Sequence, residues 1–263
     1  MTVNPLQNLK EEILKEYPRL NLDDKFKFAC HPNVPCYNKC CQDINIFLTP
    51  YDIVRLKNRL NITSKEFLSK YTIMPTDVNQ NYPIIQLKMN ETEEKECPFV
   101  TKLGCSVYED RPWPCRMYPV GSASPSEGTG EDQFYFMMKE DVCQGFEEGN
   151  EWSIREWLDN QEVAPYDENG ELFKEIAFNK YFVQHKKLTV KKIDFFFMAA
   201  YNLDEFKNFL NGSSFFQRFE VDEETKKKIM EDDVELLKFG FNWLKFALFS
   251  EPTMTIKSNY ENP

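Results

Sequence analysis

Eight cysteines carry most of the chemistry that this 263-residue chain could perform. Thiolates are soft ligands that select zinc, copper(I) or iron–sulfur clusters. The first four cysteines lie close together around the stretch C-Y-N-K-C-C, residues 36–41, and the other four are spread over the next hundred residues. The eight positions are Cys30, Cys36, Cys40, Cys41, Cys97, Cys105, Cys115 and Cys143.

Three interpretations of these cysteines compete. Disulfide frameworks belong to small secreted chains that are short of core, whereas this chain is long, is 41% hydrophobic and begins without a basic stretch followed by an apolar one. Buried structural thiols pack as small hydrophobes, yet Cys36, Cys40 and Cys41 lie among Pro, Asn, Lys and Gln. Metal ligation therefore explains the pattern best. Eight thiols allow two four-cysteine sites, or one site with spare cysteines, and the sequence leaves both open.

A centre built from thiolates needs nearby positive charge. Four thiolates around Zn²⁺ or an iron–sulfur core leave a net negative charge, and the acidic stretch 91–96 beside Cys97 adds to it. Arg111 and Arg116 flank Cys115 in R-P-W-P-C-R, and we predict that they offset this charge from outside the ligand set. The alternative for both arginines is ion pairing at the surface.

The residues around the cysteines carry a resemblance to a known family. The early cysteines, followed by C-P-F and by C-S-V-Y-x-x-R-P-x-x-C-R-x-Y-P at residues 105–119, resemble the CxxCxxCC family of zinc- or iron-chelating domains. These are the YkgJ-type cysteine cluster proteins, and the family includes the flagellin lysine N-methylases. The resemblance covers about residues 26–147, although the early gaps of five and three residues depart from the two-residue gaps in the family's name. It implies metal binding by the cysteines more firmly than any reaction.

The methylase relatives raise the hypothesis of a SAM-dependent protein lysine N-methyltransferase. No strand–GxGxxG–helix unit supports it among only nine glycines, and the CxxxCxxC triad of radical-SAM enzymes is absent. SAM is therefore a cofactor without a supporting motif, and the catalytic residues stay unassigned.

Composition excludes several classes of partner. The net charge of −11 argues against non-specific nucleic-acid binding and against docking on anionic lipid. No segment is apolar for the ~18 residues that a membrane span needs. We therefore expect a soluble protein of the cytoplasm.

Cysteine content divides the chain, because residues 144–263 contain none. We predict an N-terminal helical segment at 1–25, a cysteine-cluster metal-binding domain at 26–147 and a helical, aromatic-rich region at 148–263. The fold class is α+β, with a small irregular cysteine-rich domain of short strands and helices before the helical region. Strands are expected at 44–48, 83–89, 105–108 and 133–138.

Helix starts can be read from capping residues. Thr49-Pro50 with Asp52, and Thr63 with Glu66, predict two N-terminal caps. Residues 221–249 read as one long helix, and the acidic pairs at 230–235 open or flank a helix.

Together these observations predict a cytoplasmic Cys-ligated protein that carries an iron–sulfur cluster with a redox or sensing role. Two alternatives remain. One is a zinc-stapled module whose helical region binds a protein partner, and the other is the methyltransferase.

Overall fold

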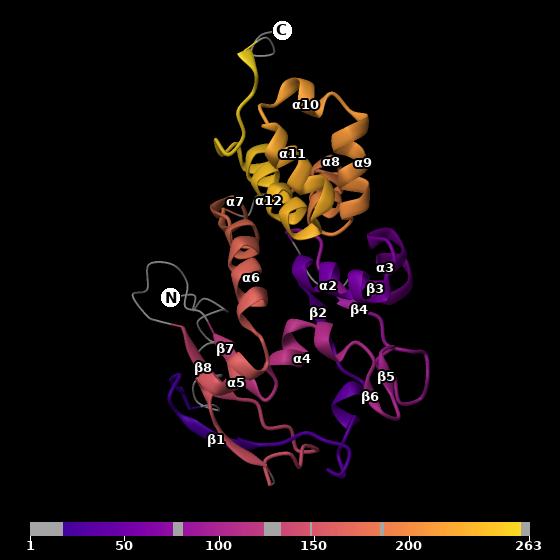
Figure 1. Ribbon diagram of the computed structural model, residues 1–263, viewed down its shortest axis with the longest axis vertical. Coiled ribbons are helices and arrows are strands. Elements are labelled where there is room, and N and C mark those ends of the chain that lie inside the picture. Colours follow the sequence, from indigo (N-terminus) through magenta and orange to yellow (C-terminus); the bar gives the residue numbers. More distant parts are fainter. Residues whose placement is uncertain (1–17, 76–80, 124–132, 148, 185–186, 259–263) are drawn as a thin grey trace.

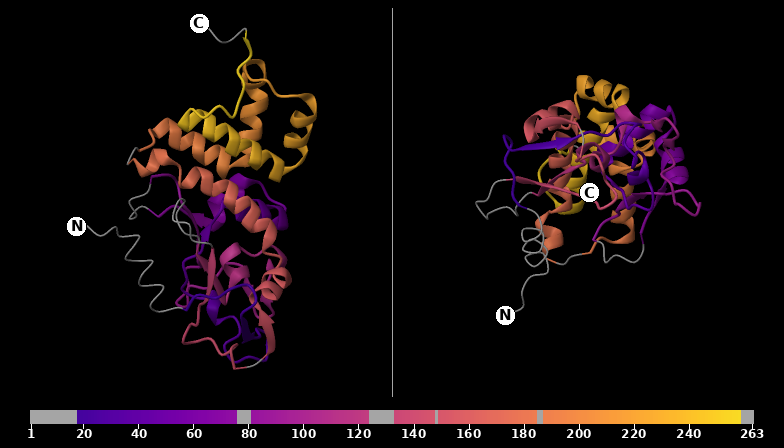
Figure 2. Two further views of the ribbon diagram at one scale, coloured as in Figure 1. Left: turned by 90° about the vertical axis from the view of Figure 1, so that its left-hand side faces the viewer. Right: turned by 90° about the horizontal axis from the view of Figure 1, so that it is seen from below.

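The computed structural model describes residues 18–75, 81–123, 133–147, 149–184 and 187–258. The molecule is elongated, with a helical region stacked on the cysteine-bearing part along its long axis (Figures 1 and 2). The strands are short: β1 Lys25–Phe28, β2 Phe47–Leu48, β3 Thr72–Ile73, β4 Ile85–Leu87, β5 Val100–Thr101, β6 Gly104–Cys105, β7 Val120–Ala123, β8 Phe134–Met137 and β9 Asn150–Ser153.

The remaining elements are helices. In the cysteine-bearing part they are η1 Lys39–Cys41, α2 Pro50–Leu60, α3 Ser64–Tyr71, η2 Tyr108–Asp110 and α4 Trp113–Met117. After it follow α5 Ile154–Asn160, α6 Ala164–Ala177, α7 Lys180–Val183, α8 Val190–Ala200, α9 Leu203–Gly212, α10 Phe215–Arg218, α11 Glu223–Glu231 and α12 Asp233–Phe249.

The sheets are small and antiparallel, in the orders β1-β9, β2-β4-β3, β5-β6 and β7-β8. In the first of these, Lys25 lies opposite Ser153 and Phe28 opposite Asn150. This layout confirms the predicted α+β class with a helical C-terminal region.

Both predicted caps are present. The hydroxyl of Thr49 accepts a hydrogen bond from the backbone N–H of Asp52, whose carboxylate accepts from the N–H of Thr49. Thr63 and Glu66 make the same reciprocal pair at the start of α3. Each pair satisfies N–H groups that a helix start leaves without an intrahelical partner.

Several element predictions were wrong in extent. The strands expected at 44–48 and 83–89 are only Phe47–Leu48 and Ile85–Leu87. Residues 221–249 form two helices, because Asp232 adopts extended backbone and caps the second one: its Oδ1 accepts from the N–H groups of Val234 at 2.7 Å and Glu235 at 3.2 Å. The predicted opening of a helix by this acidic run is confirmed. The strand expected at 105–108 ends at Cys105, and Tyr108 begins η2.

The hydrophobic core is built from both halves of the chain. The larger cluster joins α2 and α3 to α8, α9 and α12, with buried residues such as Leu56, Phe67, Phe206 and Leu244. A smaller cluster beside the cysteines contains Phe28, Met117, Val120, Ile154, Trp157 and Val163. Strand β9 begins just beyond the predicted boundary at residue 147 and pairs with β1, so independent folding of 26–147 stays a prediction.

The predicted N-terminal helical segment falls largely outside the described residues, which begin at residue 18. In the part that is described, Leu20 forms a bridge with Tyr135. No helix in the described ranges combines the length and hydrophobicity needed to cross a bilayer.

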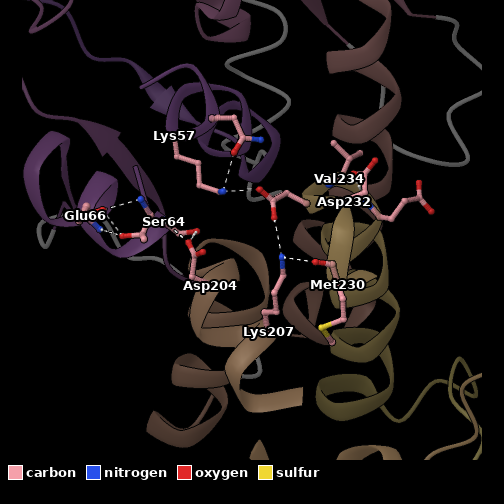
Figure 3. Close-up of polar contacts among 12 residues, drawn as sticks. Lys57, Ser64, Glu66, Asp204, Lys207, Met230, Asp232 and Val234 are labelled. Carbon is pink, nitrogen blue, oxygen red and sulfur yellow. Dashed lines mark hydrogen bonds and ion pairs between the residues drawn. The ribbon is translucent and has the colours of Figure 1, made fainter. Parts of the chain in front are cut away.

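Polar contacts fasten the helical region to α2 and α3 (Figure 3). The backbone N–H and the hydroxyl of Ser64 on α3 donate to the Oδ2 of Asp204 on α9, at 2.5 and 2.7 Å. The ammonium of Lys207 on α9 donates to the carbonyl of Met230 at 3.0 Å. The contact of Ser64 with Asp204 fixes α9 against α3, and the contact of Lys207 with Met230 joins α9 to α11 within the helical region.

Candidate metal centre

The eight cysteines lie on four separate stretches of the cysteine-bearing part, and all eight are free thiols. Cys30 follows β1, and Cys36 precedes η1, which ends in Cys40 and Cys41. Cys97 precedes the β5–β6 hairpin, and Cys105 is the last residue of β6. Cys115 lies in α4, and Cys143 lies in the loop after β8.

Backbone hydrogen bonds hold these stretches side by side. The N–H of Cys97 donates to the carbonyl of Cys41 at 2.8 Å, and Val100 pairs with Cys105 across the hairpin. The sulfur of Cys36 accepts from the N–H of Gln144 at 3.1 Å. Residues more than one hundred positions apart in the sequence are therefore neighbours at the site.

Repulsion between thiolates identifies two groups of neighbouring sulfurs. Burial, followed by repulsion from nearby thiolates, raises the pKa of Cys30 to about 11. The thiolates that act on it define the first group, which consists of Cys30, Cys36, Cys40 and Cys143. The second group consists of Cys41, Cys97, Cys105 and Cys115, linked by the same kind of repulsion.

Within the second group the sulfurs are the more crowded. Burial, then nearby thiolates, raise the pKa of Cys97 to about 11 and move the pKa of Cys115 well above its ordinary value. Cys115 is exposed as a whole residue, yet the protein atoms around its sulfur are dense enough for burial to be the main cause of its raised pKa.

Cys40 lies where the two groups meet. Its charge acts on Cys30 in the first group and on Cys97, Cys105 and Cys115 in the second. A hydrogen bond from the thiol of Cys41 lowers the pKa of Cys40 and raises that of Cys41. The adjacent pair thus joins the groups.

The donor set fits a thiophilic metal in its chemistry. In the described part of the chain, no three Cys, His, Asp or Glu side chains converge closely enough to hold a metal ion as they stand. Their raised pKa values keep most of the sulfurs protonated, and a bound cation would supply the positive charge that ionises them.

Tyr118 lies beside Cys143. Its Oη is buried and has no hydrogen-bond partner of good geometry, although burial and the nearby Cys143 thiol raise its pKa. A buried phenol normally finds a partner. Here the hydroxyl lies within reach of a sulfur to which it could donate once that sulfur is a thiolate.

The two arginines are buried, and Arg116 also lies 4.0 Å from the carboxylate of the exposed Glu162. Arg111 donates to the carbonyl of Tyr108 at 2.5 Å and to the side chain of Gln161. Burial raises the pKa of Cys105, and the charge of Arg111 partly opposes this effect. Arg116 is 2% exposed and donates to the backbone carbonyl of Gln161. Arg111 therefore lies beside the thiols, and the role of both arginines in offsetting charge stays a prediction.

Sequence reasoning missed the contribution of the turn between α5 and α6. Gln161 in this turn accepts hydrogen bonds from both arginines. Its side-chain oxygen accepts from Arg111, and its backbone carbonyl accepts from Arg116. The indole of Trp157 donates to the carbonyl of Met117 at 3.0 Å, and Asp167 on α6 accepts from the indole of Trp113 at 2.7 Å. We call residues 111–119 the ligand segment, and these contacts hold it from the helical side.

Comparison with known proteins gives one match. Residues 29–144 match the model of the CxxCxxCC family, which is described as a "putative zinc- or iron-chelating domain". The match contains all eight cysteines and confirms the resemblance predicted from their pattern. No curated protein and no solved structure matches the chain.

Proposed function

We propose that this chain is a metal-binding protein whose cysteines hold iron–sulfur clusters, with a redox or sensing role. The observation that carries the proposal is the set of eight free cysteines, all of which lie inside the segment that matches the metal-chelating family. The family description names iron and zinc as the chelated metals. Resemblance to the flagellin lysine N-methylases favours iron.

The grouping of the sulfurs supports two centres of four cysteines each. The first group would supply Cys30, Cys36, Cys40 and Cys143, and the second Cys41, Cys97, Cys105 and Cys115. Adjacent cysteines point in different directions in most backbone conformations, so Cys40 and Cys41 can serve different centres. When bound, each cluster would supply one-electron chemistry at a potential set by burial and by hydrogen bonds to its sulfurs.

Residues outside the ligand set are available to tune such a centre. The Oη of Tyr118 is a hydrogen-bond donor near Cys143, and the guanidinium of Arg111 acts on Cys105. Hydrogen bonds and positive charge near cluster sulfurs stabilise their negative charge.

Metal analysis of anaerobically purified protein tests the proposal. We expect a brown protein with broad absorption near ~400 nm, containing iron and acid-labile sulfide. A colourless protein with stoichiometric zinc would mean that the cysteines hold structural zinc, in closed four-ligand sites, instead of iron–sulfur clusters. Protein that takes up neither metal would overturn the proposal as a whole.

Serine substitutions test the two-centre grouping. Cys36→Ser and Cys105→Ser should each remove about half of the iron, and the double variant should remove nearly all of it. Ser106→Ala is the matched control. Ser106 is the neighbour of Cys105, and its hydroxyl donates a hydrogen bond to the carbonyl of Phe99. Loss of all the iron in either single variant would indicate one shared centre.

A further inference from the structure

A single buried carboxylate is shared between the starts of two helices. The Oδ2 of Asp52 accepts from the N–H and the hydroxyl of Thr49, both at 2.7 Å, and so caps its own helix α2. Its Oδ1 accepts from the backbone N–H of Trp113, the first residue of α4, at 2.8 Å. Asp52 has no exposed surface, so no water competes for these bonds.

Helix α4 depends on this contact because its own sequence supplies no cap. Its N-cap residue, Pro112, makes no side-chain cap, and Pro114 has no N–H to offer. Without Asp52 the N–H of Trp113 would lose the hydrogen bond that this carboxylate accepts. Cys115 is the third residue of α4, so the contact that fixes the start of this helix also fixes the position of Cys115.

The position is electrostatically unfavourable for a site built from thiolates. The negative charge of Asp52 acts on Cys115 and opposes its ionisation. Burial raises the pKa of Asp52 itself to about 6, although its hydrogen bonds and Arg116 favour the carboxylate. A buried carboxylate beside a metal ligand therefore needs a geometric reason. The shared hydrogen bonds provide one.

We propose that Asp52 is a positioning residue for the metal ligand Cys115, acting through the N–H of Trp113. This inference rests on the proposed metal-binding function. Asp52 does not bind the metal. It holds α4 at a fixed place before the metal arrives, so that Cys115 is presented to the other thiols of the second group.

Asp52→Asn separates this role from simple capping of α2. The amide has one acceptor oxygen, and the side that faces Thr49 has two donors, whereas the side that faces Trp113 has one. The oxygen should therefore face Thr49, which turns the NH₂ group toward the N–H of Trp113 and breaks that link. The variant keeps the shape of the buried side chain and most of the α2 cap.

Thr49→Val is the complementary variant, because it removes the hydroxyl from the α2 cap and leaves the carboxylate of Asp52 on Trp113. Asp204→Asn is a second control. Asp204 caps Ser64 on α3 in the same manner, from a helix that carries no cysteine.

Anaerobic titration of the metal-free full chain with Co²⁺ tests the proposal, read by the affinity and by the intensity of the thiolate-to-cobalt absorption. We expect Asp52→Asn to bind Co²⁺ at least about 10-fold more weakly, with reduced thiolate absorption. Losing a contact that orients a metal ligand commonly weakens metal binding by at least this much. Both controls should match the wild-type spectrum. An unchanged spectrum in Asp52→Asn, or an equal loss in Thr49→Val, would overturn the positioning role.

Two further outcomes keep the inference distinct from the proposed function. If the wild-type chain gives no thiolate absorption with Co²⁺, and takes up no iron, the proposed function fails and the inference fails with it. If Asp52→Asn does not fold, hydrogen exchange of the wild type decides. The N–H of Trp113 should be protected before metal is added, and exchange at the rate of an open amide would refute the pre-positioning.

Discussion

The ammonium of Lys57 lies 2.6 Å from the Oδ2 of Asp233 and joins α2, within the family-matched segment, to the start of α12. Lys207 on α9 approaches the other oxygen of the same carboxylate at 3.5 Å (Figure 3). The side chains of Lys57 and Asp233 are only 7% and 20% exposed, so solvent screens this ion pair weakly. One carboxylate therefore fastens three helices that are far apart in the sequence.

Acid should weaken this junction. Burial alone would raise the pKa of Asp233, but the hydrogen bond and charge of Lys57, with help from Lys207, hold it below its ordinary value. A carboxylate with a lowered folded-state pKa stabilises the fold above its unfolded pKa, near ~3.9, and loses that contribution as pH falls through the folded value. Asp233→Asn should cost roughly 2 kcal/mol at neutral pH, and the difference from wild type should shrink below about pH 4.

Urea unfolding at several pH values measures this effect. Glu235→Gln is a suitable control, because its ion pair with Lys238 is exposed on both sides and should be worth at most ~0.5 kcal/mol. A difference between Asp233→Asn and wild type that stays constant from pH 7 to 3 would contradict the linkage.

The break between α11 and α12 should depend on its cap. Asp232→Ala removes the acceptor for the N–H groups of Val234 and Glu235, so it should destabilise the protein by about 1 kcal/mol. Asp232→Asn keeps an acceptor oxygen and should lose much less. Thermal or urea unfolding distinguishes the two, and equal losses would argue against the capping role.

The buried turn that receives both arginines should matter for stability. Gln161→Met preserves the length of the side chain but leaves the guanidinium of Arg111 without its side-chain acceptor, at a cost of about 1–3 kcal/mol. Gln86→Met is the control, because Gln86 bonds Asn45 at an exposed position on β4 and should change unfolding by less than ~0.5 kcal/mol. Similar values for the two variants would mean that Arg111 finds another partner.

Metal should stabilise the fold by an amount that grows with the logarithm of its free concentration. Binding to the folded state alone adds about 2.7 kcal/mol when free metal is 100 times the dissociation constant. The melting temperature should therefore rise with added metal and fall on chelation. The double variant Cys36→Ser with Cys105→Ser should lose this dependence, and a wild-type melting temperature that ignores chelation would contradict metal ligation.

Sequence reasoning succeeded where the causes are short-range. The caps at Thr49 and Thr63 need only residues three positions apart, and the structure contains both. The family resemblance rests on a local pattern around Arg111 and Cys115, and the match over residues 29–144 confirms it.

Its failures have long-range causes. Nothing in the sequence near Gln161 marks it as the acceptor for two arginines, because that role depends on α5 packing against the ligand segment. The break at Asp232 is an exception with a local cause: the apolar spacing continues on both sides, and only the cap from Asp232 to Val234 and Glu235 interrupts the helix. Asp52 was predicted as a cap of α2, but its second contact, with Trp113, joins residues 61 positions apart.

The pairing of β1 with β9 has a consequence for synthesis on the ribosome. The strand that begins the cysteine-bearing part finds its partner only beyond Cys143, and the turn at Gln161 and helix α6 follow later still. At translation rates of about 5–20 residues per second, residues 144–177 take roughly 2–7 s to add. For that time all eight thiols have been made while the segment that holds Cys115 lacks its support, so their full arrangement can form only after α6 has been added.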